Sequence, residues 1–295
     1  MPVITLLIVD IDNTLFDWFD FWYNSFTAMV NAVLDRTQID RDVLLREIRE
    51  VHQRHGTTEY TWVLQDVPSV SALPKSLQQQ VIDAGRVAFS EARERTAHLY
   101  VDVDSTLRAV KRTGARIVGF TESQSFYTIQ RLLRFGLDGV LDALYCREEH
   151  VKPADVDLES LRSRPPDAYI LKKTSVVELK THNRKPDQQI LLRIASDFQA
   201  PLDQVLYVGD SKMKDIYMAQ RAGVHDAFAE YGQSMNRQGY DLLRAVSSWT
   251  SEEIAKEKLM AIEVKPTVVL KSFSELFRYF TFVGPEQLQV KGSAQ

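Results

Sequence analysis

The sequence has only one cysteine, Cys146, among its 295 residues. A disulfide within the chain is therefore excluded, and this sparing use of cysteine fits a reducing compartment. No motif flanks Cys146, so we expect a buried structural thiol rather than a nucleophile. On these grounds we expect a cytoplasmic protein.

Long runs of charge of one sign are also lacking, and the formal net charge is only −4. A nucleic-acid-binding domain usually carries a basic patch or stripe, so a nucleic-acid polymer is not an expected partner. The phosphate loop Gly-x-x-x-x-Gly-Lys and the dinucleotide fingerprint Gly-x-Gly-x-x-Gly are missing too. ATP-binding and NAD-binding folds therefore gain no support.

Long hydrophobic runs are absent as well. The apolar run Val3–Val9 is only as long as a strand, has no cationic residue ahead of it and ends at Asp10. A signal peptide or a membrane span would need a longer apolar stretch. We therefore expect no association with a membrane.

What the sequence does contain is an alternation of strand-like and helix-like segments. Short apolar runs rich in branched residues predict strands buried on both faces of a parallel sheet. Amphipathic stretches between them predict helices, two of which stop at a glycine. The predicted strands are Ile4–Val9, Ala115–Phe120 and Gln204–Val208, and the predicted helices are Thr106–Thr113, Ser125–Phe135 and Asp187–Phe198. This order predicts a Rossmann-like α/β fold with a mostly parallel sheet and helices on both faces.

Residues 17–97 interrupt the alternation with helical patterns and no convincing strand. These patterns are Asp17–Leu34, Arg41–His55, Glu59–Gln65 and Ser76–Glu94. A block of helices placed after the first strand of an α/β domain predicts a separate all-helical cap. The catalytic core is then formed by residues 1–16 and 98–295.

Two further stretches do not fit the alternation, and we predict that they are insertions in the core without an assigned role. Residues 147–184 are polar, and a short hairpin is predicted around Tyr169–Leu179. Residues 234–261 have a helical pattern and precede a last predicted strand, Thr267–Leu270.

The strongest chemical signal is the segment Asp10–Thr14, directly after the first predicted strand. In open α/β sheets, ligands bind beyond the carboxyl ends of the strands. Asp10 and Asp12 place two carboxylates there, which is costly unless a proton or a cation balances their charge. Hard oxygen ligands suit Mg²⁺, so the segment predicts a magnesium site. The alternative is an acidic loop that only caps the following helix.

Two weaker signals lie further along the chain. Thr121 and Glu122 follow the second predicted strand, where a hydroxyl and backbone N–H groups can hold a phosphate oxygen. Lys185 opens a predicted helix, and a cation there can neutralise the charge that develops during phosphoryl transfer. The alternatives are an ordinary helix cap for the first and a solvated lysine for the second.

The third predicted strand runs into Gly209, Asp210 and Ser211, and Asp215 follows five residues after Asp210. Gly209 permits a tight turn, and Asp210 can complete an oxygen shell with the carboxylates of the first motif. An aspartate that merely caps a helix is the alternative. Because three strands end in such residues and a lysine precedes the third, the set as a whole favours one shared site.

This ordered set resembles the haloacid dehalogenase-like hydrolase superfamily. The matching elements are Asp-x-Asp-x-Thr at Asp10–Thr14, the strand-end Thr121, Lys185, and Gly-Asp-x-x-x-x-Asp at Gly209–Asp215. The resemblance covers Pro2–Leu15 and Asp102–Phe280, and the helical insertion resembles the C1 cap of that superfamily.

The resemblance implies a Mg²⁺-dependent phosphatase. Asp10 would attack phosphorus and form an aspartyl-phosphate, and Asp12 would act as general acid and then as general base. Dehalogenases of the superfamily lack the second aspartate, so Asp12 favours phosphate chemistry. The other implied roles are phosphate binding by Asp10, Thr121, Glu122 and Lys185, metal binding by Asp10, Asp12 (through its main-chain carbonyl) and Asp210, and support by Thr14, Gly209, Ser211 and Asp215.

Several assignments stay open in the sequence. Lys180 and Lys152 are alternatives to Lys185, which we favour because an amphipathic helix and then the Asp210 strand follow it directly. A phosphomutase, or a non-catalytic binding protein on the same fold, is an alternative to a phosphatase. The expected partner is a small phosphorylated metabolite, such as a nucleotide or a sugar phosphate, and the oligomeric state is not predicted.

Residues of the predicted cap give weaker signals. Four aromatic residues in or directly before the predicted cap could stack on a base or sugar. Aromatic residues at helical spacing are, however, more typical of a hydrophobic core. These residues are Phe16, Trp18, Phe21 and Trp22. His52 and His55 lie three residues apart on a predicted helix, but without a third ligand we do not predict a metal site there.

Overall fold

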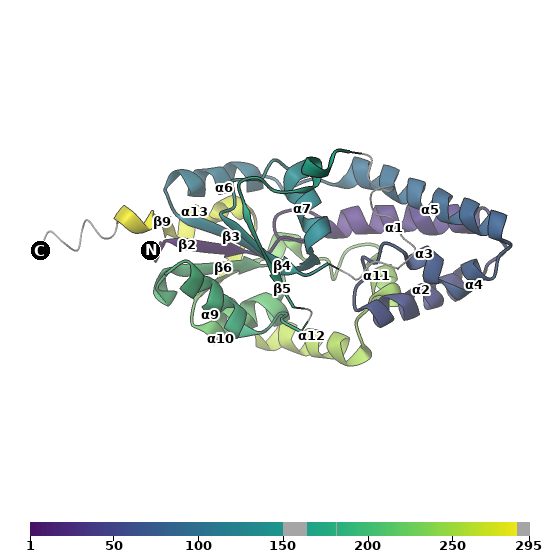
Figure 1. Ribbon diagram of the computed structural model, residues 1–295. Coiled ribbons are helices and arrows are strands. Elements are labelled where there is room, and N and C mark those ends of the chain that lie inside the picture. The colour runs from purple at the N-terminus through teal and green to yellow at the C-terminus, as the bar shows by residue number, and fades with distance from the viewer. Residues whose placement is uncertain (150–163, 181, 288–295) are drawn as a thin grey trace, which may run out of the picture. The chain divides into compact units, whose positions relative to one another are not determined.

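The strand that delivers Asp10 lies at the centre of a parallel sheet (Figure 1). The computed structural model describes residues 1–149, 164–180 and 182–287. Seven strands follow one another in the order β5-β4-β3-β2-β6-β7-β8, and every neighbouring pair is parallel. They are β2 (Leu6–Val9), β3 (Arg116–Gln124), β4 (Ala143–Arg147), β5 (Ser175–Leu179), β6 (Val205–Gly209), β7 (His225–Ala229) and β8 (Val268–Leu270). A separate parallel pair joins β1 (Val3–Ile4) to β9 (Thr281–Phe282).

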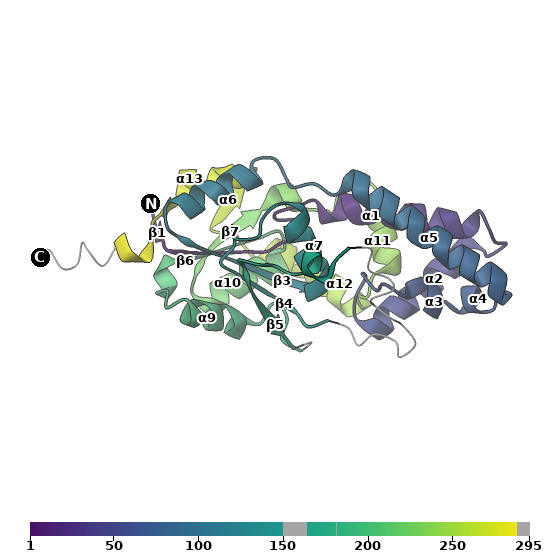
Figure 2. The same ribbon diagram turned by 45° about the horizontal axis from the view of Figure 1, so that its top comes forward.

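Helices cover both faces of this sheet, which confirms the predicted α/β fold. Figures 1 and 2 show α6 and α13 on one face and α9 and α10 on the other. The helices of this part of the chain are α6 (Val103–Arg112), α7 (Ser125–Arg134), α9 (Gln188–Asp197), α10 (Tyr217–Ala222) and α13 (Leu276–Tyr279). Short turns accompany them at η1 (Pro166–Tyr169), η2 (Leu202–Gln204), the π-helical η3 (Lys212–Ile216), η4 (Glu230–Gly232) and η5 (Phe273–Glu275).

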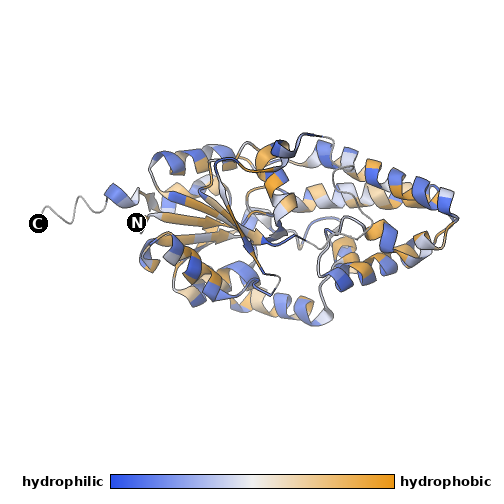
Figure 3. Ribbon diagram, viewed as in Figure 1, coloured by the Kyte–Doolittle hydropathy of each residue, from blue (hydrophilic) through white to orange (hydrophobic). Residues whose placement is uncertain are grey.

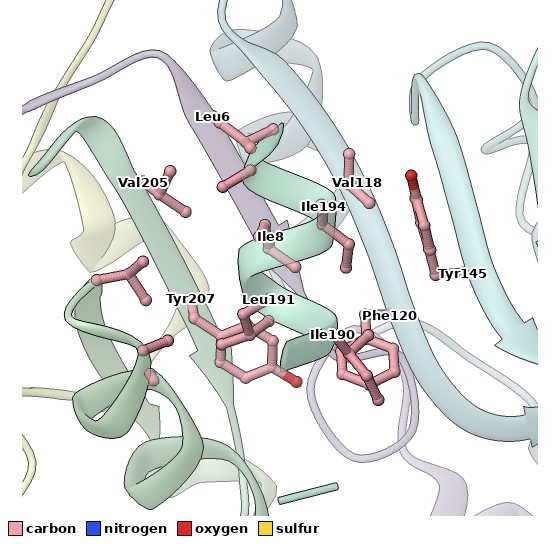
Figure 4. Close-up of a cluster of buried hydrophobic side chains, with 14 of the residues drawn as sticks. Leu6, Ile8, Val118, Phe120, Tyr145, Ile190, Leu191, Ile194, Val205 and Tyr207 are labelled. Atoms are coloured by element: carbon pink, nitrogen blue, oxygen red, sulfur yellow. The ribbon is translucent and has the colours of Figure 1, made fainter. Parts of the chain in front are cut away.

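The central strands are apolar because both of their faces are buried. All four residues of β2 are buried, and Figure 3 shows the strands as mostly hydrophobic and the helices as mixed. On one face, Leu6 and Ile8 pack with residues of β3 and β6 against Ile190, Leu191 and Ile194 of α9 (Figure 4). Burying each such side chain contributes about 1.5–3 kcal/mol, so this layer holds the strand ends in place.

The chain divides into two compact units. The first, called here the sheet unit, comprises Met1–Phe16, Leu99–Gln233 and Met260–Gln295, and the second, the helical unit, comprises Asp17–His98 and Ser234–Leu259. The helical unit contains α1 (Trp18–Leu34), α2 (Arg41–His55), α3 (Val63–Asp66), α4 (Pro68–Ser71), α5 (Lys75–Thr96), α11 (Tyr240–Val246) and most of α12 (Ser251–Glu263). No helix in the described ranges is both long and apolar enough to cross a membrane.

Residues 234–261 differ from the prediction that they belong to the core. Ser234–Leu259 group with the helical unit, and α11 packs against α2. Buried His52 of α2 contributes to this packing, since its Nδ1 lies 2.7 Å from the carbonyl oxygen of Val246. The pattern of α11 predicts a helix but not its partner, because several amphipathic helices offer a comparable apolar face.

The segment 147–184 also departs from the prediction. Instead of a hairpin around Tyr169–Leu179, it forms the turn η1 and then β5, which extends the sheet as a parallel edge strand beside β4. The predicted hairpin is therefore wrong. A hairpin joins antiparallel strands by a tight turn, whereas parallel neighbours such as β4 and β5 need a crossover connection. Residues 150–163 of this segment, including Lys152, lie outside the described residues.

The buried histidine leads to a prediction about pH. Burial lowers the pKa of His52 from 6.5 to about 4, so the neutral ring is the form that folds. Its contribution to stability is present above pH 6.5 and is lost as the pH falls towards 4. Between pH 6.5 and pH 4, the free energy of unfolding should fall less for His52→Gln than for wild type. The difference should be about 3 kcal/mol at most. Urea unfolding of wild type and His52→Gln at several pH values tests this.

Candidate active site

Strands β2, β3 and β6 of the main sheet bring their carboxyl ends to one edge. β2 lies between β3 and β6, and Val9 is level with both Gly119 and Val208. The backbone N–H of Asp10 donates to the carbonyl oxygen of Val208 at 2.9 Å. The loops that follow these three strands therefore start side by side, within the sheet unit.

Lys185 joins two aspartates from different loops. Its Nζ lies 2.6 Å from Oδ1 of Asp10 and 2.8 Å from Oδ1 of Asp215. All three residues are buried, with exposed fractions of 6% for Asp10, 7% for Lys185 and 1% for Asp215. The hydroxyl of Tyr207 and the backbone N–H of Ser211 donate to Asp215 at 2.9 Å each, which fixes its orientation toward the lysine.

Burial shifts the ionisation of these groups. It raises the pKa of Asp10 to about 7, against the attraction of Lys185 and with additional repulsion from Asp215 and Asp12. Burial, Asp10 and Asp215 raise the pKa of Asp210 well above its usual range. Burial opposes the charge of Lys185, but Asp10 and Asp215 outweigh it and raise the pKa of the lysine. The pocket is thus richer in negative charge than its single lysine can balance.

The donor set fits a divalent cation. Carboxylate oxygens of Asp10, Asp210 and Asp215 lie within 4.8 Å of one another. When all three carboxylates are ionised, the single ammonium of Lys185 balances one of them and leaves two negative charges for a cation. Oxygen ligands of this kind suit Mg²⁺. Asp210 and Asp10 are the residues best placed to hold it, because Asp215 is already engaged by three donors.

Close backbone packing holds these loops together. A side chain at Gly209 would meet Cγ of Asp215 at 2.4 Å, and one at Gly232 would meet the carbonyl oxygen of Asn13 at 1.7 Å. Thr14 Oγ1 donates to Oδ2 of Asp10 at 3.4 Å. The hydroxyl of Tyr231 donates to the carbonyl oxygen of Thr14 at 2.8 Å. Glycines therefore stand where the loops after β2, β6 and β7 come closest.

Asp12 belongs to a second polar group beside the first. Its Oδ1 accepts from Arg131 at 2.9 Å, and its Oδ2 accepts from Thr121 at 3.2 Å and Ser123 at 2.5 Å. The predicted residues Asp12 and Thr121 are thus brought together. The side chain of Asp12 is not among the three carboxylates that cluster, so a metal ligand from Asp12 stays a prediction for its main-chain carbonyl.

Glu122 lies next to this group and is also paired. Its Oε2 accepts from Nζ of Lys214 at 2.5 Å, and the ammonium outweighs the effect of burial and holds the pKa of Glu122 below its usual range. A charged carboxylate repels phosphate, so only the backbone N–H of Glu122 suits the phosphate-binding role predicted for it.

The aspartates of the first motif, Thr121 and Asp210 do not serve as the helix caps that the sequence left open as alternatives. The helix after the first motif is capped by Asp17, whose carboxylate accepts from the N–H of Asp20, and not by Asp10 or Asp12. Strand β3 continues to Gln124, with an irregular register after Phe120, so Thr121 lies within the strand and not at the start of α7. The cap of η3 is Ser211, which leaves Asp210 free of that role.

The alternative lysine and the histidines lie elsewhere. Lys180 is exposed and pairs with Glu148 at 3.0 Å, whereas Lys185 is buried against Asp10. His55 Nε2 lies 3.1 Å from Oδ2 of Asp66. Among the described residues, the three aspartates of the sheet unit are the one group of acidic, histidine or cysteine ligands close enough to hold a metal. Cys146 is buried, and burial raises the pKa of its thiol to about 12.

Sequence reasoning missed three residues of the site: Ser123, Arg131 and Lys214. Arg131 could have been noticed, because it falls on the same face of its helix as Ser125, Thr128 and Leu132, all of which are buried. A charged residue on a buried face needs a partner. Nothing in the local sequence around Ser123 or Lys214 sets them apart from other polar residues.

Comparison with known proteins places this geometry in a family. The family model for haloacid dehalogenase-like hydrolases matches residues 4–223, and a second model, HAD-hydrolase-like, matches residues 182–276. A curated glyceraldehyde 3-phosphate phosphatase of Methanopyrus kandleri is 22% identical over 226 residues, covering 75% of this chain and 82% of that protein.

Solved structures show the same fold at low sequence identity. A predicted phosphoglycolate phosphatase from Haemophilus somnus has a TM-score of 0.50 and 16% identity, covering 93% of this chain and 97% of the other. The hydrolase YfnB of Bacillus subtilis, bound to magnesium, has a TM-score of 0.51 and 13% identity with the same coverage. At such identities the likeness concerns the fold.

Proposed function

We propose a phosphatase activity for this chain, which belongs to the haloacid dehalogenase-like hydrolases because the family model covers most of its length. The substrate is a small phosphomonoester, the nucleophile is Asp10, and the cofactor is Mg²⁺. The activity for which the curated relative is named, glyceraldehyde 3-phosphate phosphatase, supports this class of substrate.

One observation carries the proposal: buried Asp10 is held by Lys185 beside Asp210 and Asp215. Burying charged groups costs desolvation free energy, which their mutual attraction often does not recover. Stability of the fold therefore does not explain why four ionisable groups from different segments are buried together. Catalysis explains the arrangement, because a carboxylate nucleophile needs a nearby cation to reduce its repulsion from an anionic phosphate. Asp12, two residues after the nucleophile, supports phosphate rather than halide chemistry.

The first half of the reaction transfers the phosphoryl group to the protein. Asp10 Oδ forms a bond to phosphorus while the bond to the leaving oxygen breaks, and Asp12 donates a proton to that oxygen. Lys185 balances the charge on Asp10 and on the phosphoryl oxygens. Thr121 and the backbone N–H groups of β3 orient the phosphoryl group.

The second half returns the nucleophile. Asp12 accepts a proton from water, whose oxygen attacks the phosphorus of the aspartyl-phosphate, and the Asp10–phosphorus bond breaks to release inorganic phosphate. Asp10, Asp210 and the main-chain carbonyl of Asp12 would hold Mg²⁺, which would supply further charge neutralisation for the transfer. The same two carboxylates thus act in both halves of the cycle.

Phosphate release tests this function and its dependence on metal. The protein, freed of metal by EDTA, is incubated with a library of phosphorylated metabolites that includes glyceraldehyde 3-phosphate and phosphoglycolate. We expect turnover to rise on the order of 10²-fold or more when Mg²⁺ is added, because several kcal/mol of charge stabilisation depend on the cation. Inorganic phosphate is quantified, and the remaining organic phosphate is analysed by mass spectrometry.

The product separates the alternatives. Isomerised sugar phosphate without free phosphate would identify a phosphomutase. Neither product from any substrate, together with no Mg²⁺ binding by calorimetry, would point to a binding protein and contradict the proposal.

A further inference from the structure

Arg131 is a buried arginine that reaches back from α7 to the loop after β2. Only 8% of the residue is exposed. Its guanidinium stands over the ring of Phe16, with 5.0 Å between its central carbon and the ring centroid. A buried guanidinium is tolerated when it is paired and stacked, so the position of its charge is well defined.

The partner of this guanidinium is the carboxylate of Asp12. Arg131 NH1 lies 2.9 Å from Oδ1 of Asp12 and 3.2 Å from Oγ of Ser123. The other oxygen, Oδ2, accepts from the hydroxyls of Ser123 and Thr121. Both ends of the carboxylate are therefore held, one by a fixed charge and the other by two hydroxyls that can rotate.

We infer that Arg131 is a positioning residue for Asp12, and that it fixes which carboxylate oxygen faces the leaving group. This inference rests on the phosphatase function proposed above. Arg131 holds Oδ1, so the proton is carried by Oδ2. The hydroxyl of Ser123 can donate to Oδ2 in both protonation states, because a protonated carboxyl oxygen still accepts a hydrogen bond. The carboxyl group therefore keeps its place through the cycle, and its proton stays available to the leaving oxygen.

The inference concerns one bond-breaking step. As phosphorus moves to Asp10, the bond to the leaving oxygen breaks and the proton on Oδ2 of Asp12 passes to that oxygen. An alkoxide needs this proton, whereas p-nitrophenolate is stable without it. Loss of Arg131 should therefore slow the transfer from alkyl phosphates and spare the transfer from p-nitrophenyl phosphate.

The test measures kcat/KM, which reports the first transfer, for a series of aryl and alkyl phosphates with wild type and Arg131→Gln. We expect a fall of about 10²-fold for alkyl phosphates and less than about threefold for p-nitrophenyl phosphate. Arg134→Gln, on the exposed side of the same helix, is the matched control and should follow wild type. In an Asp12→Asn background, Arg131→Gln should have no further effect, because the two residues act as one unit.

Two results with Arg131→Gln would overturn the inference. An equal loss for all leaving groups would show that Arg131 supports only the fold. A full extra loss in the Asp12→Asn background would show that it acts elsewhere. If Arg131→Gln does not fold, Arg131→Lys, which keeps the cation, is measured instead. The dependence of its kcat/KM on the leaving group should lie between those of wild type and Asp12→Asn. A dependence equal to that of wild type would count against the inference. Failure of the wild-type protein to release phosphate from any substrate, together with no Mg²⁺ binding, would instead overturn the phosphatase function itself.

Discussion

Asp10→Asn is expected to lower kcat by about 10⁴-fold or more, because an amide cannot form the phosphoryl intermediate. The phosphate-release assay with the best substrate measures this loss. Added Mg²⁺ should not restore activity, since the missing group is the nucleophile and not only a ligand. A variant that keeps a tenth of the wild-type kcat would remove Asp10 from the centre of the mechanism.

The same variant should keep its fold, and the pH dependence of its stability gives an independent check. Burial raises the pKa of Asp10 from 3.8 to about 7. A carboxyl with a raised pKa stabilises the folded state when protonated, and this contribution is lost as the pH rises from about 4 through 7. Asparagine resembles the protonated form. Without metal, the melting temperature of Asp10→Asn should therefore exceed that of wild type at pH 8, and the two should converge at pH 4.

Lys185→Met should reduce both activity and stability. It leaves the carboxylates of Asp10 and Asp215 buried beside Asp210 without their cation. Breaking a buried ion pair in this way costs about 3–5 kcal/mol. Loss of the cation at the phosphoryl group should also lower kcat by about 10²–10³-fold. Urea unfolding and phosphate release measure the two effects.

Lys180→Met is the matched control for this variant. Lys180 is exposed and pairs with Glu148 on the surface, where an ion pair is worth about 0–1 kcal/mol. Its removal should leave activity unchanged. If Lys180→Met lost activity and Lys185→Met kept it, the assignment of the catalytic lysine would be reversed.

The part of the fold that could be predicted is the part that periodicity and strand composition determine. The central strands β2, β3 and β6 are apolar on both faces, and their runs are visible in the sequence. β4 and β7 were not predicted. β7 begins with His225 and Asp226, and the apolar run of β4 is only four residues long before Arg147, so neither stands out as a strand. Their neighbours in the sheet complete their burial, which a local pattern does not reveal.

The candidate site shows the same division. Asp10, Thr121 and Asp210 follow predicted strands, and the rule that parallel strands present their carboxyl ends at one edge is enough to bring them together. Lys185 comes from a segment between β5 and α9, so its place beside Asp10 depends on tertiary structure. The pairing of Arg131 with Asp12 spans 119 residues, and only the structure shows it.

The phosphoryl group itself can be followed to the residue that receives it. A rapid-quench experiment stops the wild-type protein in acid within milliseconds of mixing with substrate and Mg²⁺, and peptide mass spectrometry then locates any covalent phosphate. We expect it on Asp10, absent without Mg²⁺ and absent in Asp10→Asn. A phosphate on another residue, or rapid turnover with no phosphorylated peptide at any time, would contradict the account.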